Sequence, residues 1–246
     1  MRRRKSFRSS LGLLLLLIGV QAMADDIRVA VASNFATTME TLAHRFEQAS
    51  GHHVIVIPGA SGRLYAQILH GAPFDAFFSA DSERPEKLEN SGHAIEGSRF
   101  TYAIGRLMLW SRDGSLIGSD GRATLKEGRF EKLAIANPRL APYGRAAVQV
   151  LENIGFTAGN RVVRGENVGQ AYQFVHSGAA ELGLVAASQL VGGEKGSRWD
   201  IPQQLYDPIE QQAVLLNDSS AARAFFDWLQ TDAARDIIRQ HGYGTP

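Results

Sequence analysis

The chain has 246 residues, of which 44% are hydrophobic and 21% are charged, and it contains no cysteine. This composition is typical of a folded protein, and the lack of cysteine excludes disulfide bonds, thiolate metal sites, a cysteine nucleophile and lipid attachment through cysteine. The formal net charge is only +1, which gives no indication of a nucleic-acid surface.

Residues 1–24 have the three parts of an export signal. A positive start (Arg2, Arg3, Arg4, Lys5 and Arg8) is followed by an apolar run at 11–20 and by the small-residue cleavage site Ala22-Met23-Ala24. The apolar run is about half as long as the roughly 20 residues that a membrane-spanning helix needs. We therefore expect an exported mature chain that begins near Asp25 and has no stable membrane insertion.

The mature chain is mildly acidic. Removal of the signal takes away five of the 26 Lys and Arg residues and none of the 25 Asp and Glu residues, which leaves a net charge of −4. Because nucleic-acid binding needs clustered positive charge, we expect no such partner. An anionic ligand would have to be held by local dipoles against this unfavourable overall field.

Apolar runs alternate with helical patterns in the first part of the mature chain. The predicted strands are 27–32, 53–57 and 74–79, and the helices that follow them are 35–50, closed by Gly51, then 62–70 and 84–90. Three strand-helix units in succession predict a parallel sheet covered on both faces.

A second set of elements follows and predicts a second lobe. It begins with the apolar run 102–110 and continues with strand 133–136, helix 144–154, strand 161–163, helix 168–177 and strand 182–186. A late strand at 212–216 precedes helices at 220–229 and 232–241. We expect an α/β protein with two Rossmann-like domains and two crossovers, lobe I being 25–105 and 208–246 and lobe II 106–207.

The strand-to-helix junctions are rich in small, hydroxyl and amide residues. Ligands of open α/β sheets bind beyond the carboxyl ends of the strands, where helix N-termini expose backbone N–H groups. Ser33, Asn34, Ser61 and Asn167 stand at such junctions, and each of them could instead be a plain helix cap. Because two junctions come from each lobe, we expect uncharged donors to meet across one cleft.

Such a cleft suits a fully ionised tetrahedral anion. Several N–H and O–H donors together with helix N-termini can replace the hydration of a dianion. Donors without acceptors also disfavour a protonated anion, since its O–H group would be buried without a partner.

At these junctions the sequence resembles a known family, the periplasmic molybdate-binding proteins of ABC importers. The resemblance rests on six segments in the family's order: VAVASNF (29–35), PGASGRLYAQI (58–68), FDAFFSAD (74–81), LAIANPRLAPYGRAA (133–147), ENVGQAYQFV (166–175) and ELGLVAAS (181–188). It implies a type II periplasmic binding protein that captures molybdate or tungstate, uses no cofactor and delivers its ligand to a membrane permease. We expect this protein to be a monomer.

The resemblance also implies which residues touch the oxygens of molybdate. These are Ser33 and Asn34 after the first strand, Ser61 after the second, Tyr143 in the APYG segment and the backbone N–H of Val168; any contact to the metal is only through those oxygens. Some members have a tyrosine after the strand that matches LGLV, where this chain has Ala186. Tyr143 fits the branch whose tyrosine lies in the APYG-like segment, and it is then the site's only aromatic hydroxyl.

Two other functions compete with this interpretation. The nearer one is a binding protein for another oxyanion such as sulfate or phosphate, and the other is a secreted α/β enzyme. No phosphate loop, G-x-S-x-G elbow or spaced histidine pair occurs, and the Asp75 and Asp81 pair fits structural roles. Arg63, two residues after Ser61, could approach an anion, although an arginine in a first helical turn more often faces solvent.

Overall fold

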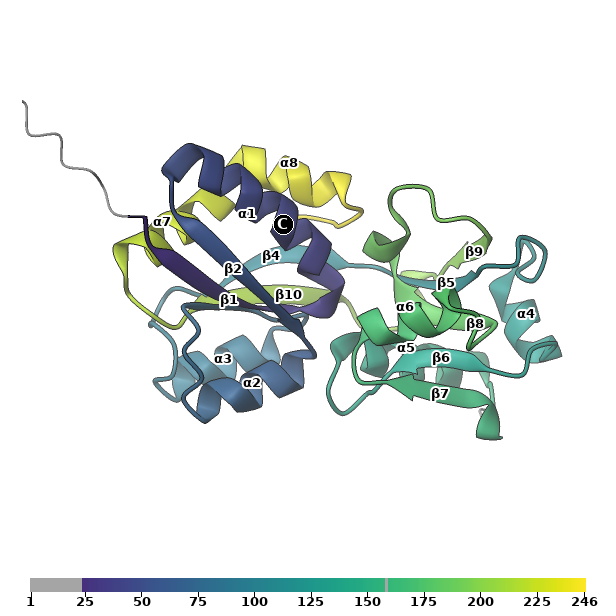
Figure 1. Cartoon of the computed structure of the whole chain (residues 1–246). Helices are drawn as coiled ribbons and strands as arrows, with labels where there is room; N and C mark the ends of the chain where they lie inside the picture. The colour runs from purple at the N-terminus through teal and green to yellow at the C-terminus, as the bar shows by residue number, and fades with distance from the viewer. Residues whose placement is uncertain (1–23, 158) are drawn as a thin grey trace, which may run out of the picture.

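The computed structural model describes residues 24–157 and 159–246. The export signal that we predict at 1–24 therefore lies, apart from Ala24, outside the described residues. Two α/β lobes lie side by side and the chain passes between them more than once (Figure 1). No helix among the described residues combines the length and the hydropathy needed to cross a membrane.

The first sheet has the strand order β2-β1-β3-β10-β4. Its strands are β1 (Asp26–Ala32), β2 (His53–Gly59), β3 (Ala76–Phe78), β4 (Phe100–Gly105) and β10 (Ile209–Leu215). β1 pairs in parallel with β2 and β3, as the strand-helix pattern predicts, whereas β10 runs antiparallel to β3 and β4. The late strand therefore enters the middle of the first sheet.

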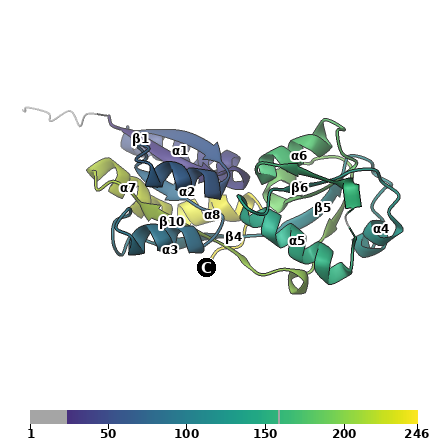
Figure 2. The same ribbon diagram turned by 90° about the horizontal axis from the view of Figure 1, so that it is seen from below.

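Helices cover both faces of this sheet (Figures 1 and 2). They are α1 (Ala36–Ser50), preceded by a 3-10 turn at Ser33–Phe35, and α2 (Ser61–Leu69), α3 (Glu83–Asn90), α7 (Ser220–Leu229) and α8 (Asp232–Gln240). One core holds residues of α1, α7 and α8, and a smaller core on the other face holds Leu64, Ile68 and Leu88 of α2 and α3. Gly51 ends α1 with φ 79°, as predicted.

The second sheet has the strand order β7-β6-β8-β5-β9. Its strands are β5 (Leu107–Ser111), β6 (Leu133–Ala136), β7 (Val162–Gly165), β8 (Leu182–Ala186) and β9 (Ser197–Asp200), and its helices are α4 (Gly121–Glu127), α5 (Pro142–Ile154) and α6 (Val168–His176). Three further 3-10 turns lie at Gly159–Arg161, Ala187–Leu190 and Gln203–Leu205. α5 packs on one face and α6 on the other.

The apolar run 102–110 is not one element. It ends the first sheet as β4 and opens the second as β5, with only Arg106 between the two strands. The chain returns to the first sheet at Ile209. Our predicted crossover after Gly105 lies at this point, although periodicity alone does not separate two adjacent buried strands.

Parallel register brings the junctions of each sheet together. The last residues of β1 and β2 pair as Ala32 with Gly59, and those of β6 and β7 pair as Ala136 with Gly165. The turns that follow β1 and β2 therefore lie beside each other at one sheet edge, and those after β6 and β7 do so in the other lobe.

Candidate functional site

The turns of both lobes border a small, partly open cavity with a volume of about 10 Å³. Its lining residues are uncharged and come from the ends of β1, β2 and β3 and the starts of α2, α5 and α6: Ala32, Ser33, Asn34, Gly59, Ala60, Ser61, Ala80, Ala141, Pro142, Tyr143, Asn167 and Val168. Pockets that hold organic ligands usually have about 300–1,000 Å³. The space is therefore far smaller than a pocket for an organic ligand. All five residues predicted to bind the ligand lie on its wall.

Ser33 and Ser61 do not cap helices. The N-cap positions of the helical segments that they open are Ala32 and Ala60, without a side-chain cap bond, so the capping interpretation is wrong for both serines. Ser61 Oγ accepts a hydrogen bond from Ala80 N at 3.0 Å, and Ser33 Oγ accepts one from Gly169 N of the second sheet's lobe at 3.3 Å. A hydroxyl that accepts such a bond still has its proton to donate.

Asn34 turns its side chain away from the wall of the cavity and into the first lobe. Its Nδ2 donates to Gln211 Oε1 at 2.8 Å and to Tyr243 Oη at 3.1 Å. Its carbonyl oxygen accepts from Tyr243 Oη at 2.6 Å and from Ser188 Oγ at 3.1 Å. Because the amide side chain is engaged in these bonds, the part of Asn34 that remains for a ligand is its backbone N–H.

Tyr143 lines the cavity at the start of α5, which begins at Pro142, two residues before the predicted helix start at Gly144. Its hydroxyl oxygen lies beside Gly105 and Gln211, where the chain crosses between the lobes. Burial raises the pKa of Tyr143 well above its ordinary value, so the hydroxyl stays protonated. The N–H of Tyr143, in the first turn of α5, has no intrahelical acceptor, which leaves it as a donor toward the cavity.

Val168 is the first residue of α6, and Asn167 is the N-cap. The side chain of Asn167 accepts from Gln170 N at 2.9 Å, so the capping interpretation is confirmed at this residue. Helix first-turn N–H groups lack intrahelical partners, and aligned peptide dipoles give the N-terminus a partial positive charge. The starts of α2, α5 and α6 therefore bring this charge to one uncharged cavity.

The two lobes touch around the cavity. Gly62 N donates to Leu140 O at 2.8 Å, and the Arg63 guanidinium pairs with the Glu166 carboxylate at 2.8 Å. A Cβ at Gly62 would lie 3.0 Å from Leu140 O, so this approach favours glycine. The positive charge of Arg63 is thus paired with a carboxylate of the other lobe.

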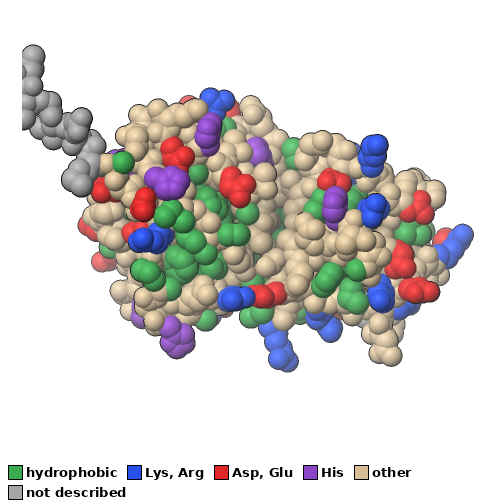
Figure 3. All heavy atoms as spheres, in the orientation of Figure 1, with side chains coloured by type: hydrophobic (Ala, Val, Ile, Leu, Met, Phe, Trp, Pro, Cys, Tyr) green, Lys and Arg blue, Asp and Glu red, His purple; other side chains and the backbone are tan. Residues whose placement is uncertain are grey.

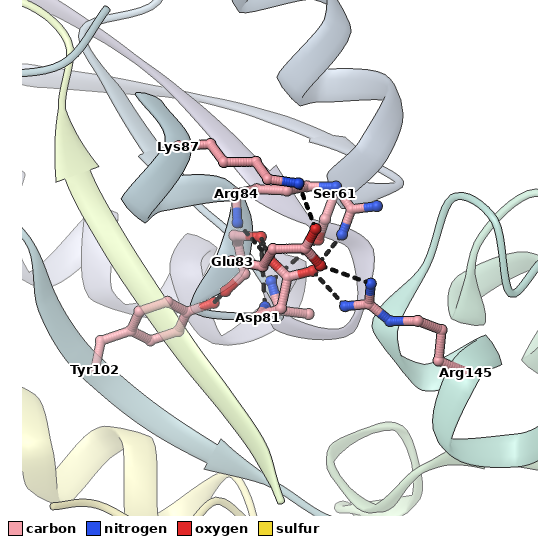
Figure 4. A network of polar contacts seen from close by, with 9 residues as sticks. Ser61, Asp81, Glu83, Arg84, Lys87, Tyr102 and Arg145 are labelled. Carbon is pink, nitrogen blue, oxygen red and sulfur yellow. Dashed lines mark hydrogen bonds and ion pairs between the residues drawn. The ribbon is translucent and has the colours of Figure 1, made fainter. Parts of the chain in front are cut away.

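A second ion-pair network joins the lobes next to Ser61 (Figure 4). Arg145 of α5 bonds the Asp81 carboxylate at 2.8 Å and the Glu83 carboxylate at 2.9 Å, while Arg84 pairs with Asp81 from within the first lobe. Lys87 and Arg145 hold the pKa of Glu83 below its ordinary value. The lobes are therefore observed in contact.

The remaining sequence candidates have structural roles. Asp75 accepts from Arg28 N and from Asn217 Nδ2, and Asp81 is paired with two arginines, which agrees with the structural interpretation of both acids. Among residues 24–157 and 159–246, no three His, Asp or Glu side chains are grouped to hold a metal ion. Ala186 is fully buried on β8.

Two residues near the cavity escape sequence reasoning. Gln211 stands between Glu210 and Gln212, just before the predicted strand 212–216, so the sequence gives no sign of a buried amide there. Arg145 looks like an ordinary polar residue on a helix. The acidic residues that Arg145 meets are more than 60 positions away in the chain. On the face shown in Figure 3, cationic and anionic side chains are interspersed, so this face has no broad positive patch.

Comparison with known proteins gives consistent matches over the length of the chain. The sequence profile of a family described as bacterial extracellular solute-binding protein matches residues 27–244. The molybdate-binding protein ModA of Azotobacter vinelandii is 46% identical over 236 residues, which cover 93% of each chain. That of Rhodobacter capsulatus is 44% identical and covers 93% of this chain and 92% of its own.

A solved structure shows the same fold. The Azotobacter vinelandii periplasmic molybdate-binding protein superposes with a TM-score of 0.86 at 43% identity, and the match covers 89% of this chain and 99% of that one. The two-lobed α/β arrangement predicted from the sequence is confirmed by this match.

Proposed function

The chain belongs to the bacterial extracellular solute-binding proteins, and from this membership we propose that it captures molybdate or tungstate between its lobes and delivers the oxyanion to an ABC importer. Its high-identity relatives are molybdate-binding proteins, and the protein is a periplasmic transport component without enzymatic activity. The proposed ligand is molybdate or tungstate, and no cofactor is implied.

One observation carries this proposal: a small uncharged cavity is bordered by the starts of three helices, α2 from the first lobe and α5 and α6 from the second, and by two serine hydroxyls of the first lobe. A dianion can be bound without a counter-charge when helix N-termini and several neutral donors replace its water. A lining without carboxylates places no anionic acceptor opposite the oxyanion, which disfavours its protonated form. The volume leaves little room for an organic acid.

We propose five contacts to the molybdate oxygens. Ser33 and Ser61 donate their hydroxyl protons, and Asn34, Tyr143 and Val168 donate backbone N–H groups. The support for this assignment is the orientation of the Asn34 and Tyr143 side chains, which point away from the cavity toward Gln211. The metal itself is reached only through its oxygens.

We propose lobe I as 25–105 with 208–246 and lobe II as 106–207. Closure is then a hinge motion at the two crossovers, and the ligand stabilises the closed state because both lobes contact it. The closed surface is what the membrane permease recognises. Export through the signal at 1–24 and a monomeric state complete the proposal.

A titration of the purified mature chain tests this function. Molybdate and tungstate are compared with sulfate and phosphate by calorimetry and by thermal melting. A ligand at a hundredfold excess over its Kd adds about 2.7 kcal/mol to the free energy of unfolding. We expect this shift with molybdate and tungstate and a much smaller one with sulfate and phosphate. Equal shifts with sulfate would assign a general tetrahedral-oxyanion carrier instead.

A further inference from the structure

A buried polar network lies behind the cavity, at the crossover between the lobes. At its centre is Gln211 on β10, whose side chain is fully buried. A break in register between Gln211 and Gln212 interrupts the pairing of β10 with β4. Irregularities of this kind re-aim a side chain. They often occur next to functional sites.

The oxygen end of the Gln211 amide is satisfied within the first lobe. Oε1 accepts from Asn34 Nδ2 at 2.8 Å and from Tyr102 Oη at 3.1 Å. Tyr102 Oη also bonds Ser79 O at 3.0 Å. These bonds fix the orientation of the amide, because Oε1 is the atom that can accept from two donors.

The nitrogen end of the same amide faces the other lobe. Gln211 Nε2 and Tyr143 Oη are buried without a hydrogen-bond partner among the described residues. A Cβ at Gly105 would lie 2.8 Å from Nε2 and would collide with Tyr143 Oη, so both atoms flank the same backbone position. A buried polar atom without a hydrogen-bond partner destabilises the folded state. One bond from Nε2 to Oη would remove both costs.

We infer that Gln211 is a positioning residue of the oxyanion site, which links Asn34 of one lobe to Tyr143 of the other when the lobes close. Both partners carry proposed donors: Asn34 N–H stands after β1, and Tyr143 N–H stands at the start of α5. The amide therefore sets the relative position of donors from the two lobes. Gly105 is the residue that lets Tyr143 and Gln211 approach the crossover.

This inference rests on the proposed function, and it predicts coupled effects on affinity. Tyr143→Phe removes only the hydroxyl, and Gln211→Met removes both ends of the amide. We expect each to weaken molybdate binding about tenfold, and the double variant to weaken it about tenfold rather than about hundredfold, because residues in one network are not additive. Tyr172→Phe is the matched control, since it removes a tyrosine hydroxyl that bonds Glu194 and does not line the cavity; its affinity should stay within about twofold.

The distance between the two lobes gives a second measurement. This distance would not change if Gln211 and Tyr143 contributed to folding alone. The chain has no cysteine, so spin labels can be attached at His70→Cys and Lys132→Cys, which lie on exposed positions of different lobes. We expect saturating molybdate to give one short inter-label distance in the otherwise unchanged protein and a broader distribution in Tyr143→Phe.

The outcomes separate cleanly. Additive losses of affinity, or an unchanged Tyr143→Phe, would overturn the role of Gln211. Weaker binding by Tyr143→Phe with an unchanged closed distance would overturn it as well, and would make the hydroxyl a direct ligand. If Gln211→Met does not fold, the contrast between Tyr143→Phe and Tyr172→Phe decides alone. Failure of the unsubstituted chain to bind any oxyanion would instead refute the proposed function.

Discussion

The two lobes meet the cavity with different kinds of donor. From the first lobe come the hydroxyls of Ser33 and Ser61, which already accept hydrogen bonds from backbone N–H groups. From the second come N–H groups of the first turns of α5 and α6, at Tyr143 and Val168. A hydroxyl depends on the side chain, whereas an N–H depends on the backbone path. Each serine hydroxyl of the first lobe can therefore be removed by a single side-chain change, whereas the N–H groups of the second lobe, like that of Asn34, survive nearly all such changes.

The difference also bears on which anion is selected. N–H groups can only donate, so the second lobe selects for the charge of the ligand and the position of its oxygens. A serine hydroxyl can donate or accept, so a lobe with serines alone would tolerate a protonated ligand. The two sets of donors together discriminate more strongly against a protonated anion than the serines would alone. The reason is that Ser33 and Ser61 already accept hydrogen bonds from Gly169 N and Ala80 N, which occupy part of their acceptor capacity.

The largest effect is expected from Ser61→Ala. The change removes one proposed donor to the oxyanion, and hydrogen bonds to charged groups contribute about 1.5–3 kcal/mol. We expect molybdate affinity to fall roughly 10- to 150-fold in calorimetry, since about 1.4 kcal/mol is tenfold. The ligand-free protein should also lose stability, because Ala80 N–H loses its acceptor.

Ser115→Ala is the matched control for this change, since Ser115 is exposed in the second lobe and bonds Asp113 instead. Its affinity should equal that of the unsubstituted protein. An equal loss in both variants would mean that Ser61 acts through stability alone.

Val168→Pro tests the backbone N–H donors of the second lobe. Proline is tolerated at the first position of a helix and lacks the N–H, and the extended backbone of Asn167 (φ −141°, ψ 176°) is compatible with a following proline. We expect affinity to fall about tenfold or more with the fold retained. Val168→Ala keeps the N–H and should bind within about threefold. Equal binding by both variants would remove Val168 from the donor set.

Much of the scaffold behind these donors was predictable from sequence. β6, β8 and α7 were predicted residue for residue, because each is a strongly apolar or periodic segment with clear flanks. α4 and β9 were missed: α4 opens with Gly121 and buries little beyond Leu125, and β9 reads Ser197, Arg198, Trp199, Asp200, without an apolar run. These elements depend on tertiary packing more than on local pattern.

For the site, it was easier to predict which residues line the cavity than to predict which of their atoms face it. Junction residues follow from strand ends, so Ser33, Ser61 and Val168 could be named. That Tyr143 turns its hydroxyl to the hinge depends on Gly105 and Gln211, which are 38 and 68 residues away in the sequence and give no local signal. Side-chain direction at a junction is decided by such long-range contacts, and periodicity does not carry that information.

A moderate effect is expected from Arg145→Gln, which tests how the lobes are held together. Arg145 joins the second lobe to Asp81 and Glu83 of the first, and its side chain is 43% exposed. Exposed ion pairs contribute about 0.2–1 kcal/mol, so molybdate affinity should fall about two- to fivefold at low salt. The difference should shrink as ionic strength rises.

Arg122→Gln on α4, away from the cleft, is the control and should leave affinity unchanged at every salt concentration. If Arg145→Gln binds as tightly as the unsubstituted chain at low salt, the network in Figure 4 does not contribute to closure.

The smallest effect is expected from Glu83, the first-lobe partner of Arg145 in the same network, whose contribution to stability should depend on pH. Because Lys87 and Arg145 hold the pKa of Glu83 below its ordinary 4.5, the folded state binds the proton less readily than the unfolded chain. Glu83 therefore contributes stability above about pH 4.5, and this contribution disappears as the pH falls through the lower folded pKa. Melting of the ligand-free protein should show Glu83→Gln slightly less stable at pH 6 and equal at pH 3. A constant gap at both values would show that the contribution of Glu83 does not arise from its charge. The contact of Glu83 with Arg145 between the lobes would then stabilise the protein through packing rather than through ion pairing.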